Sequence, residues 1–391
     1  MKNTEELLEE KRRNRMEDRV LGFGVIGCGN FCEAYLSTLG VKYKNVRPVC
    51  CSDLVVERAE KVAAEYNIRA CTTEEMLKDP EVDIVLILTT PQSHYSLSKM
   101  ALNAGKHVYC EKPMSLNVEQ ANEIVALAEE KGLYVGNAPD TFLDGALQTC
   151  RKLIDDGEIG DIIGVTANFV GPGHEIWHPH PDFYYQVGGG PVLDMAPYFL
   201  TALVSLVGPI EELYCYGVTG FKERILQDRV IKPEVLTNYS GVLKFRCGAI
   251  GNMNMSFDIW KSMQPRMEIH GTKGSIIAPD PNTNRGGIHL MRGERFREQL
   301  LKLPQMQRPG MLYMPDLKMF EDIEPVFPTA GMERGRGVSD MADAIVHGRK
   351  ARAGADIARH VSEALAAFNI CVETGKPYVM QSTCERPEPL Y

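Results

Sequence analysis

The sequence predicts two domains of different architecture: a parallel, doubly wound α/β sheet, and then an α+β domain with a large open, mostly antiparallel sheet. Three observations support this prediction. Apolar runs and helix-like segments alternate regularly up to residue 145, as expected for parallel strands joined by crossover helices. A glycine-rich turn follows the first apolar run. Beyond residue 145, helices become rarer and β-type segments follow one another.

The first half contains six apolar runs that are expected to form strands. They lie at Val20–Ile26, Val46–Cys51, Ile68–Cys71, Val82–Leu88, His107–Cys110 and Leu133–Gly136. The run Val82–Leu88 is almost continuously apolar, which is typical of a strand buried on both faces. Helical spacing appears at Phe31–Leu39, Val56–Glu65, Ser96–Asn103 and Val118–Lys131. Right-handed crossovers would place the carboxyl ends of all the strands on one rim of the sheet.

The second half is predicted to begin with a helix at Gly145–Asp155 and a strand at Ile162–Val170. Further helices are expected at Val192–Leu206, Val338–His347 and Ile357–Thr374. Between them lie β-type segments at Glu212–Val218, Tyr239–Arg246, Gly248–Phe257 and Arg266–His270. We therefore expect one domain over residues 20–145 and a second over residues 146–391. Residues 1–19 are expected to form a charged helical extension.

Composition excludes several classes of protein. The 391 residues include 43 Lys and Arg against 52 Asp and Glu, a net charge of −9, which argues against a nucleic-acid partner. Eleven scattered cysteines without zinc-type spacing indicate a reducing compartment, and we expect the cytoplasm. Because the start of the chain is charged and has no apolar stretch, we expect no secretory signal, and no apolar run is long enough to cross a membrane.

The turn Gly27-Cys28-Gly29-Asn30-Phe31 follows a strand and opens a helix. The first glycine would allow the tight turn, and the second would let the backbone approach a pyrophosphate at the helix N-terminus. Cys32 stands where this fingerprint of a Rossmann domain expects its third glycine. Asp53 closes the next strand, where a carboxylate would bind the ribose hydroxyls and repel the 2′-phosphate of NADP. We expect NAD as the cofactor.

Two more polar segments follow strands of the same predicted rim. Thr90-Pro91-Gln92-Ser93-His94 comes after the run Val82–Leu88, and Glu111-Lys112-Pro113 comes after the run His107–Cys110. Because ligands in open α/β sheets bind outside the carboxyl ends of the strands, we assign Thr90, Pro91, His94, Glu111 and Lys112 to the cofactor site.

In combination these motifs resemble the glucose–fructose oxidoreductase, inositol dehydrogenase and rhizopine-catabolism (Gfo/Idh/MocA) family. The matching segments are Gly27–Asn30, Thr90–His94, Ala104–Pro113, Gly188–Asp194 and His270–Ile276. The resemblance implies an NAD(P)-binding Rossmann domain, a C-terminal sheet that makes homo-oligomer contacts, and hydride transfer at a carbon of a sugar, cyclitol or glycoside. It also implies that Lys112 reaches the reacting hydroxyl and that Asp194 orients the substrate.

Position 198 departs from the family pattern. The family commonly has a histidine four residues after the aspartate, where it acts as general acid/base; this sequence has Tyr198. Asp194 and Tyr198 would still share one helix face. A tyrosine needs a nearby cation to act as a base near neutrality, and Lys112 is a candidate for that cation. Alternatively, another residue transfers the proton.

The loop Gly173–Tyr185 is the alternative source of that group. Its side chains expected to bind substrate, together with Asp194, are His174, Trp177, His178, His180 and Tyr185. Histidine titrates nearest neutrality, so His178 is the second candidate base. A purely structural or oligomer-contact loop and a metal site are the other interpretations; the family chemistry needs no metal, and none is expected. The loop also resembles that of bacterial glycoside 3-dehydrogenases, including those that initiate C-glycoside cleavage.

These motifs together imply an NAD-dependent dehydrogenase that oxidises a secondary alcohol of a sugar or glycoside. The expected reaction is oxidation at C3 of a glucoside, in a C- or O-glycoside of a plant aglycone. Three alternatives remain: a cyclitol or other sugar dehydrogenase, an enzyme that keeps NAD tightly bound and recycles it, and a non-catalytic NAD-binding sensor or scaffold.

Overall fold

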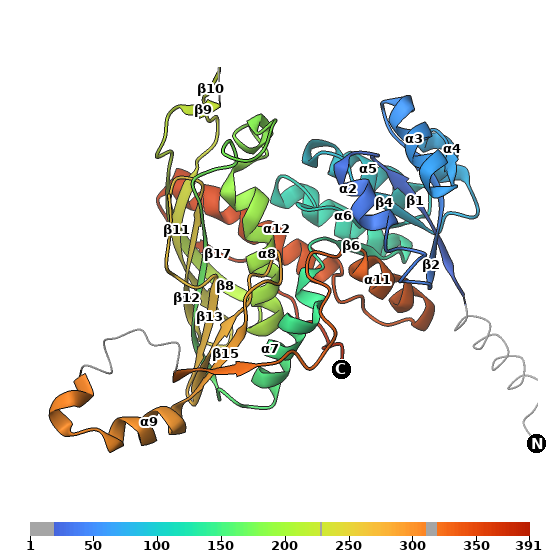
Figure 1. Ribbon diagram of the computed structural model, residues 1–391. Helices are drawn as coiled ribbons and strands as arrows, with labels where there is room; N and C mark the ends of the chain where they lie inside the picture. Colours follow the sequence, from blue (N-terminus) through green and yellow to red (C-terminus); the bar gives the residue numbers. More distant parts are fainter. Residues whose placement is uncertain (1–18, 227–228, 310–318) are drawn as a thin grey trace, which may run out of the picture. The chain divides into compact units, whose positions relative to one another are not determined.

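The computed structural model describes residues 19–226, 229–309 and 319–391, so the helical extension expected at the start of the chain lies almost wholly outside the described residues. The chain divides into two compact units (Figure 1). Unit 1 contains the residues up to Asp140 together with Glu333–Ser362, and unit 2 contains Thr141–Met332 together with Glu363–Tyr391.

Unit 1 contains a parallel six-stranded sheet. Its strands are β1 (Leu21–Ile26), β2 (Val46–Ser52), β3 (Arg69–Ala70), β4 (Ile84–Ile87), β5 (His107–Cys110) and β6 (Val135–Asn137). They lie in the order β3-β2-β1-β4-β5-β6, and each neighbouring pair is parallel. The order reverses between β1 and β4, and this is where doubly wound sheets bind their ligands. The predicted fold class of the first domain is confirmed.

The helices of unit 1 follow from the sequence pattern. They are α2 (Asn30–Leu36), α3 (Val56–Tyr66), α4 (Thr73–Lys78), α5 (Pro91–Asn103), α6 (Val118–Lys131) and α11 (Arg336–His347). Helix α6 shows the local signals: the Asn117 side chain accepts a hydrogen bond from the Gln120 amide, and Gly132 ends the helix in the left-handed region.

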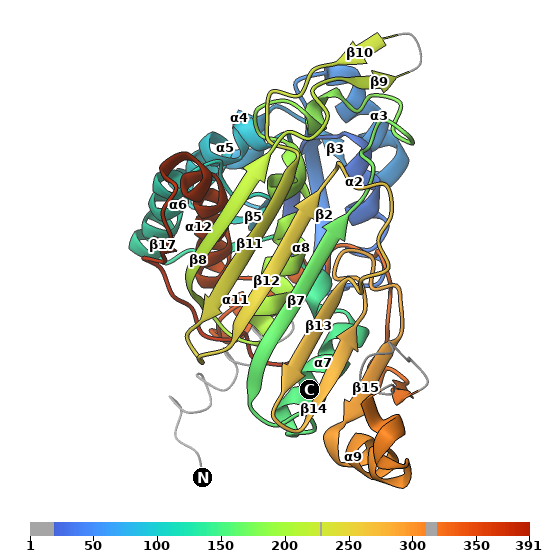
Figure 2. The same ribbon diagram turned by 90° about the vertical axis from the view of Figure 1, so that its left-hand side faces the viewer.

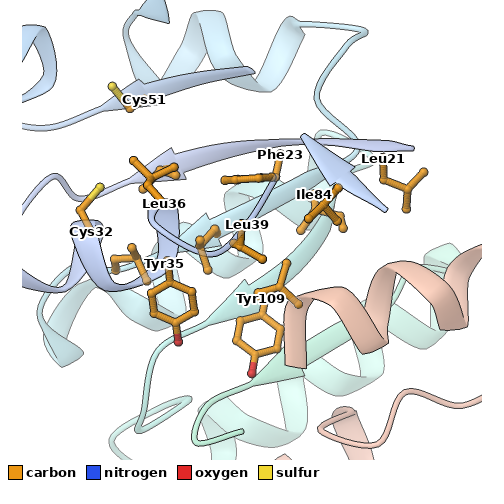
Figure 3. Packing of buried hydrophobic residues seen from close by; sticks show 14 of the residues in the cluster. Leu21, Phe23, Cys32, Tyr35, Leu36, Leu39, Cys51, Ile84 and Tyr109 are labelled. Carbon is orange, nitrogen blue, oxygen red and sulfur yellow. The ribbon is translucent and has the colours of Figure 1, made fainter. Parts of the chain in front are cut away.

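Both faces of this sheet carry an apolar core, because successive side chains of a strand point to opposite faces. In β4, Ile84 belongs to one buried cluster and Val85 to the other. Figure 3 shows the first cluster, where Tyr35 and Tyr109 lie side by side with their hydroxyl groups pointing the same way. Burial on both faces explains why the β4 segment is continuously apolar.

The single domain boundary predicted near residue 145 is not what the structure shows. The units divide after Asp140, and residues 333–362 return to unit 1. Helix α11 belongs there because Val338 and Met341 are buried in the same apolar cluster as Phe23 and Tyr109. A sequence pattern shows that a helix is amphipathic, but it does not show which distant core covers the helix's apolar face.

Unit 2 contains a nine-stranded sheet in the order β16-β15-β14-β13-β7-β12-β11-β8-β17. Its strands are β7 (Ile162–Val170), β8 (Ile210–Val218), β11 (Asn238–Phe245), β12 (Ile250–Ser256), β13 (Met267–Gly271), β14 (Gly274–Ala278), β15 (Ile288–Arg292), β16 (Glu321–Ile323) and β17 (Tyr378–Val379). Among these pairings only β7 with β12 is parallel. This confirms the predicted mostly antiparallel sheet. A separate antiparallel pair is formed by β9 (Arg224–Leu226) and β10 (Arg229–Ile231).

Helices of unit 2 cover one face of this sheet. They include α7 (Gly145–Asp155), α8 (Gly190–Leu206) and the second part of α12 (Ala355–Thr374), which lie behind the strands in Figure 2. Strand β11 shows the resulting alternation: Leu243 and Phe245 are buried under the helices, whereas Val242 on the other face is 57% exposed. A further helix, α9 (Gly293–Lys302), has no buried residue. In the described part of the chain, no helix is both long and apolar enough to span a membrane.

Candidate functional site

The glycine-rich turn after β1 depends on one residue in the left-handed region. Gly27 has φ +102°, and a Cβ there would lie 2.8 Å from the carbonyl carbon of Leu88. Gly29 is the N-cap of α2, and nothing lies within 4 Å of the position that its Cβ would take. Gly27 therefore permits the turn, whereas Gly29 leaves the approach to the first amide groups of α2 open. A pyrophosphate group requires such an open approach.

The other residues predicted at this turn lie beside it. Asn30 and Phe31 open α2 with exposed side chains. The Asp53 carboxylate accepts hydrogen bonds from the backbone N–H of Cys28 at 2.7 Å and of Val55 at 2.8 Å. Asp53 is thus fixed against the turn, and each of its oxygens keeps a lone pair that a ribose hydroxyl could use.

Cys32, which replaces the third glycine of the fingerprint, is a packing residue. Its side chain is 1% exposed and belongs to the same apolar cluster as Cys51 (Figure 3). A hydrogen bond with Cys32 raises the pKa of the Cys28 thiol to about 12. The Cys28 thiol therefore stays protonated near neutrality.

The structure separates the residues of the second rim segment. Thr90 is exposed at the N-cap of α5, and Pro91 is the first residue of that helix. His94 is fully buried, with Nδ1 2.7 Å from the Pro113 carbonyl oxygen and Nε2 3.0 Å from the Thr89 carbonyl oxygen. Burial lowers the pKa of His94. Both ring nitrogens thus face the backbone, so His94 joins two loops of the rim. Its contact with the cofactor stays a prediction.

Glu111 is also buried and links two elements. Its carboxylate accepts a hydrogen bond from the Tyr35 hydroxyl at 2.7 Å and another from the Lys112 backbone N–H at 3.0 Å. Tyr35 lies on α2, the helix that the glycine-rich turn opens. Burial raises the pKa of Tyr35 well above its usual range, so the hydroxyl remains a donor. Glu111 therefore fixes the backbone from which the half-buried Lys112 side chain extends.

In unit 2, the structure joins His174 to Asp194. The two side chains meet through His174 Nε2 and Asp194 Oδ2 at 3.1 Å. The indole N–H of Trp177 donates to His174 Nδ1 at 3.2 Å. An indole nitrogen can only donate, so Nδ1 accepts and we assign the imidazole proton to Nε2, where it donates to Asp194. Trp177 thereby selects the tautomer that supports the carboxylate.

His178, the loop histidine predicted as a base, lies in an aromatic cluster. Its ring centroid is 5.2 Å from that of Trp177, and 5.5 Å from those of Phe183 and Tyr184. His178 Nδ1 accepts a hydrogen bond from the backbone N–H of His180 at 3.0 Å. The histidine paired with Asp194 is therefore His174, which had been predicted only as a substrate contact.

The remaining predicted residues differ in exposure. The side chains of Trp177 and His180 are exposed, and Trp177 is 61% accessible. Tyr198 lies on α8 one turn after Asp194, as predicted, and is buried. Tyr185 is fully buried; its hydroxyl donates to Glu175 and accepts from the His174 backbone N–H at 3.1 Å. Tyr185 thus supports the loop, and its contact with a substrate stays a prediction.

Some polar residues at these sites were not predicted. Tyr35, Glu175 and Arg224 form buried hydrogen bonds that join segments distant in sequence. No local pattern marks them, because an isolated charged or phenolic residue is usually exposed. Within the residues that the structure describes, no three His, Cys, Asp or Glu side chains are grouped as a metal ion would require.

Three features of unit 1 define a dinucleotide-binding protein. They are its strand order, the glycine-rich turn where that order reverses, and the carboxylate that follows β2. Comparison with known families agrees. Residues 21–138 match the model of an oxidoreductase family with an NAD-binding Rossmann fold. Residues 147–277 match the GFO/IDH/MocA C-terminal domain. The chain belongs to the GFO/IDH/MocA family of oxidoreductases, and the predicted family resemblance is confirmed.

Characterised relatives cover most of the chain. This chain is 31% identical to trans-1,2-dihydrobenzene-1,2-diol dehydrogenase of Mus musculus, over 72% of this chain and 89% of that protein. It is 29% identical to 1,5-anhydro-D-fructose reductase of Ensifer adhaerens, over 61% of this chain and 70% of that one. Among solved structures, levoglucosan dehydrogenase in complex with NADH and levoglucosan has the same fold, with a TM-score of 0.73. The two chains are 20% identical, and the match covers 92% of this chain and 99% of that chain.

The two glycines of the turn should respond differently to the same substitution. In Gly27→Ala, the left-handed backbone and the Leu88 contact should destabilise the fold by about 1 to 2 kcal/mol, and NADH binding should weaken. Gly29→Ala adds a methyl group only to open space. It should keep the melting temperature but weaken NADH binding about tenfold or more, or about 1.4 kcal/mol.

Thermal unfolding and NADH fluorescence titration measure the two effects separately. Equal NADH affinity in Gly29→Ala and the natural protein would remove this turn from the cofactor site.

Proposed function

We propose that this oxidoreductase uses NAD to oxidise a secondary alcohol of a sugar or glycoside, with C3 of a glucoside as the reacting carbon. The aglycone would be a plant compound in C- or O-linkage. One observation carries the proposal: a neutral histidine, fixed by Trp177, donates to a partly exposed carboxylate on α8. A carboxylate held in this way is a suitable acceptor for a hydroxyl proton.

The residues of unit 1 would bind the cofactor and stabilise charge. The open turn at Gly29 suits the pyrophosphate, and Asp53 suits the ribose of NAD better than the 2′-phosphate of NADP. When bound, the nicotinamide ring supplies the acceptor of the hydride. The Lys112 ammonium would stabilise the negative charge that develops on the sugar oxygen, a type of interaction worth several kcal/mol in a water-excluded site.

The residues of unit 2 would bind the sugar and take up its proton. Asp194 is the proposed proton acceptor, and His174 orients it through the Nε2–H. We prefer this pair to His178 because His174 Nε2 lies 3.1 Å from Asp194 Oδ2. The rings of both histidines pack against aromatic neighbours. Tyr198 remains the rival base, because it lies one helical turn from Asp194. Exposed Trp177 and Phe183 offer flat apolar faces for the sugar or its aglycone.

The names of relatives support a small polyhydroxy substrate. One relative reduces an anhydro sugar and another oxidises a cyclic diol. The rival functions are those of a cyclitol dehydrogenase and a non-catalytic NAD-binding scaffold. The buried Glu111 that fixes the Lys112 backbone argues for catalysis, since it maintains a cation at the rim. All eleven cysteines are unpaired, which supports a reducing compartment such as the cytoplasm.

A substrate panel tests the function directly. NADH formation should be compared for methyl, aryl O- and aryl C-glucosides and for inositols, with NAD and with NADP. We expect the glucosides to react with NAD, and NMR of the borodeuteride-reduced product to place the new label at C3. Faster oxidation of inositols would favour a cyclitol dehydrogenase, and no turnover with any alcohol would favour a scaffold. NADH absorbance of the purified protein before and after substrate addition would reveal a tightly bound cofactor.

The proposed roles predict the effect of removing each group. Lys112→Ala should lower kcat about 10² to 10³-fold and leave NADH affinity nearly unchanged. Asp194→Asn should lower kcat by a similar factor. Because both groups would act in one step, the double variant should be little worse than either single variant.

The base is assigned by pH–rate profiles of four variants. His174→Gln should change the profile, whereas His178→Gln should not, and exposed His180→Gln is the matched control. A profile altered most by Tyr198→Phe would transfer the role of base to the tyrosine.

We also propose that the uncovered face of the nine-stranded sheet binds a second copy of the chain. This face presents Tyr216 at 72%, Val242 at 57% and Ile250 at 67% exposure, an apolar surface that is unusual on a free monomer. Light scattering should show an oligomer that dissociates in the Val242→Lys/Ile250→Lys variant. Ile225→Lys, which changes an exposed residue of β9, should not dissociate it. A monomeric natural protein would contradict the proposal.

A further inference from the structure

A buried arginine lies beneath the loop that carries His174. Arg224 is the first residue of β9 and is 3% exposed. Its Nη1 donates to Glu175 Oε1 at 2.9 Å and to the backbone carbonyls of Pro172 and Phe257 at 3.1 and 2.9 Å. Its Nη2 donates to Asp258. One guanidinium therefore joins β9 to two other segments of unit 2, one with Pro172 and Glu175 and one with Phe257 and Asp258.

The charges of this cluster require the arginine. The side chains of Glu175 and Asp258 are 10% and 5% exposed, and the side chain of Arg224 is 1% exposed. Two carboxylates therefore share one buried cation. The second negative charge is balanced by neutral donors: the Thr237 hydroxyl binds Asp258 at 2.6 Å, and the Tyr185 hydroxyl binds Glu175. Removal of the cation would leave two carboxylates buried near one another, an arrangement that is strongly unfavourable.

A short chain of contacts leads from Arg224 to His174. Glu175, held by Arg224, accepts from the Tyr185 hydroxyl, which in turn accepts from the His174 backbone N–H at 3.1 Å. The Arg224 guanidinium also lies 4.9 Å from the centre of the Tyr185 ring. Gly173 has φ +101°, and a Cβ there would lie 2.4 Å from Arg224 Nη1 and 2.5 Å from the Tyr185 hydroxyl oxygen. The loop backbone is thus closed tightly over the cluster.

We propose that Arg224 is a positioning residue, which acts through Glu175 and Tyr185 to hold His174 in hydrogen-bonding reach of Asp194. Nothing in the family motifs of this chain marks Arg224, which lies on a short strand outside the main sheet. The proposal rests on the proposed function of the His174–Asp194 pair for its catalytic consequence, but the positioning itself can be measured without substrate.

The chain offers a matched control in the paired strand. Arg229 of β10 binds Asp182 through two hydrogen bonds of 2.5 and 2.6 Å, and both side chains are well exposed, at 46% and 35%. Surface pairs of this kind contribute about 0 to 1 kcal/mol. Arg229→Gln therefore removes an arginine–carboxylate pair between the same strand pair and the same loop. Neither residue of this pair is a hydrogen-bond partner of His174.

The test compares Tyr185→Phe, Arg224→Lys and Arg229→Gln in the full-length protein. Tyr185→Phe removes only the oxygen that joins Glu175 to the His174 backbone. Arg224→Lys keeps the charge but cannot reproduce the fork of donors. Because Arg224→Lys could disturb folding, Tyr185→Phe decides the outcome. ¹⁵N-labelled histidine NMR, with the His174 signals identified through His174→Gln, reports the tautomer and its hydrogen bond.

We expect Tyr185→Phe to change the His174 ring-nitrogen signals, whereas Arg229→Gln leaves them unchanged. With the preferred substrate, kcat should fall about tenfold to a hundredfold, as expected for a misplaced group, and NADH affinity should be unchanged.

Unchanged His174 signals in Tyr185→Phe, or an equal change in Arg229→Gln, would overturn the proposal. Failure of the proposed function would look different. In that case the NMR change would occur in Tyr185→Phe, while neither His174→Gln nor Asp194→Asn would affect turnover.

Discussion

The hydrogen bond from His174 to Asp194 is the interaction on which the proposed substrate site in unit 2 depends. Neither side chain fixes the other alone, because an imidazole has two tautomers and a carboxylate several acceptor directions. Trp177 removes the first freedom by donating to Nδ1. Tyr185 and the arginine cluster restrain the main chain of the loop. His174 is thus a neutral, oriented donor to Asp194, because each of these contacts restricts its tautomer or its backbone.

In unit 1, carboxylates likewise fix the loop backbones at the rim of the sheet. Asp53 accepts from the Cys28 backbone N–H, and Glu111 accepts from the Lys112 backbone N–H. In both cases a carboxylate holds the backbone of a loop by a charge-assisted hydrogen bond, which is stronger than a neutral one. Glu111 also accepts a hydrogen bond from the Tyr35 hydroxyl. The same carboxylate therefore binds both the loop of Lys112 and α2, the helix that follows the glycine-rich turn. Because these loop backbones are fixed in advance, they would not have to rearrange during the proposed reaction.

The features of this protein that follow from its sequence are those with a local signal. The strands, the turn at Gly27 and the helix face shared by Asp194 and Tyr198 follow from spacing alone. The sequence led us to name His178 as the candidate base and His174 only as a substrate contact. Both belong to one irregular loop, and only packing decides which ring faces Asp194. Contacts such as that between Tyr35 and Glu111 join residues far apart in the chain. The return of residues 333–362 to unit 1 was missed for the same reason.

Tyr198 occupies the position at which the family pattern has a histidine. The family pattern places a histidine one helical turn after the aspartate, whereas here an imidazole reaches Asp194 from the loop before α8. A helix fixes the direction of a side chain by its own geometry. A loop does not, and must be fixed by other contacts. The buried arginine cluster and the Trp177 hydrogen bond meet that requirement. A loop that supplies the histidine, as proposed, therefore needs the buried polar contacts that are found around residues 172–185.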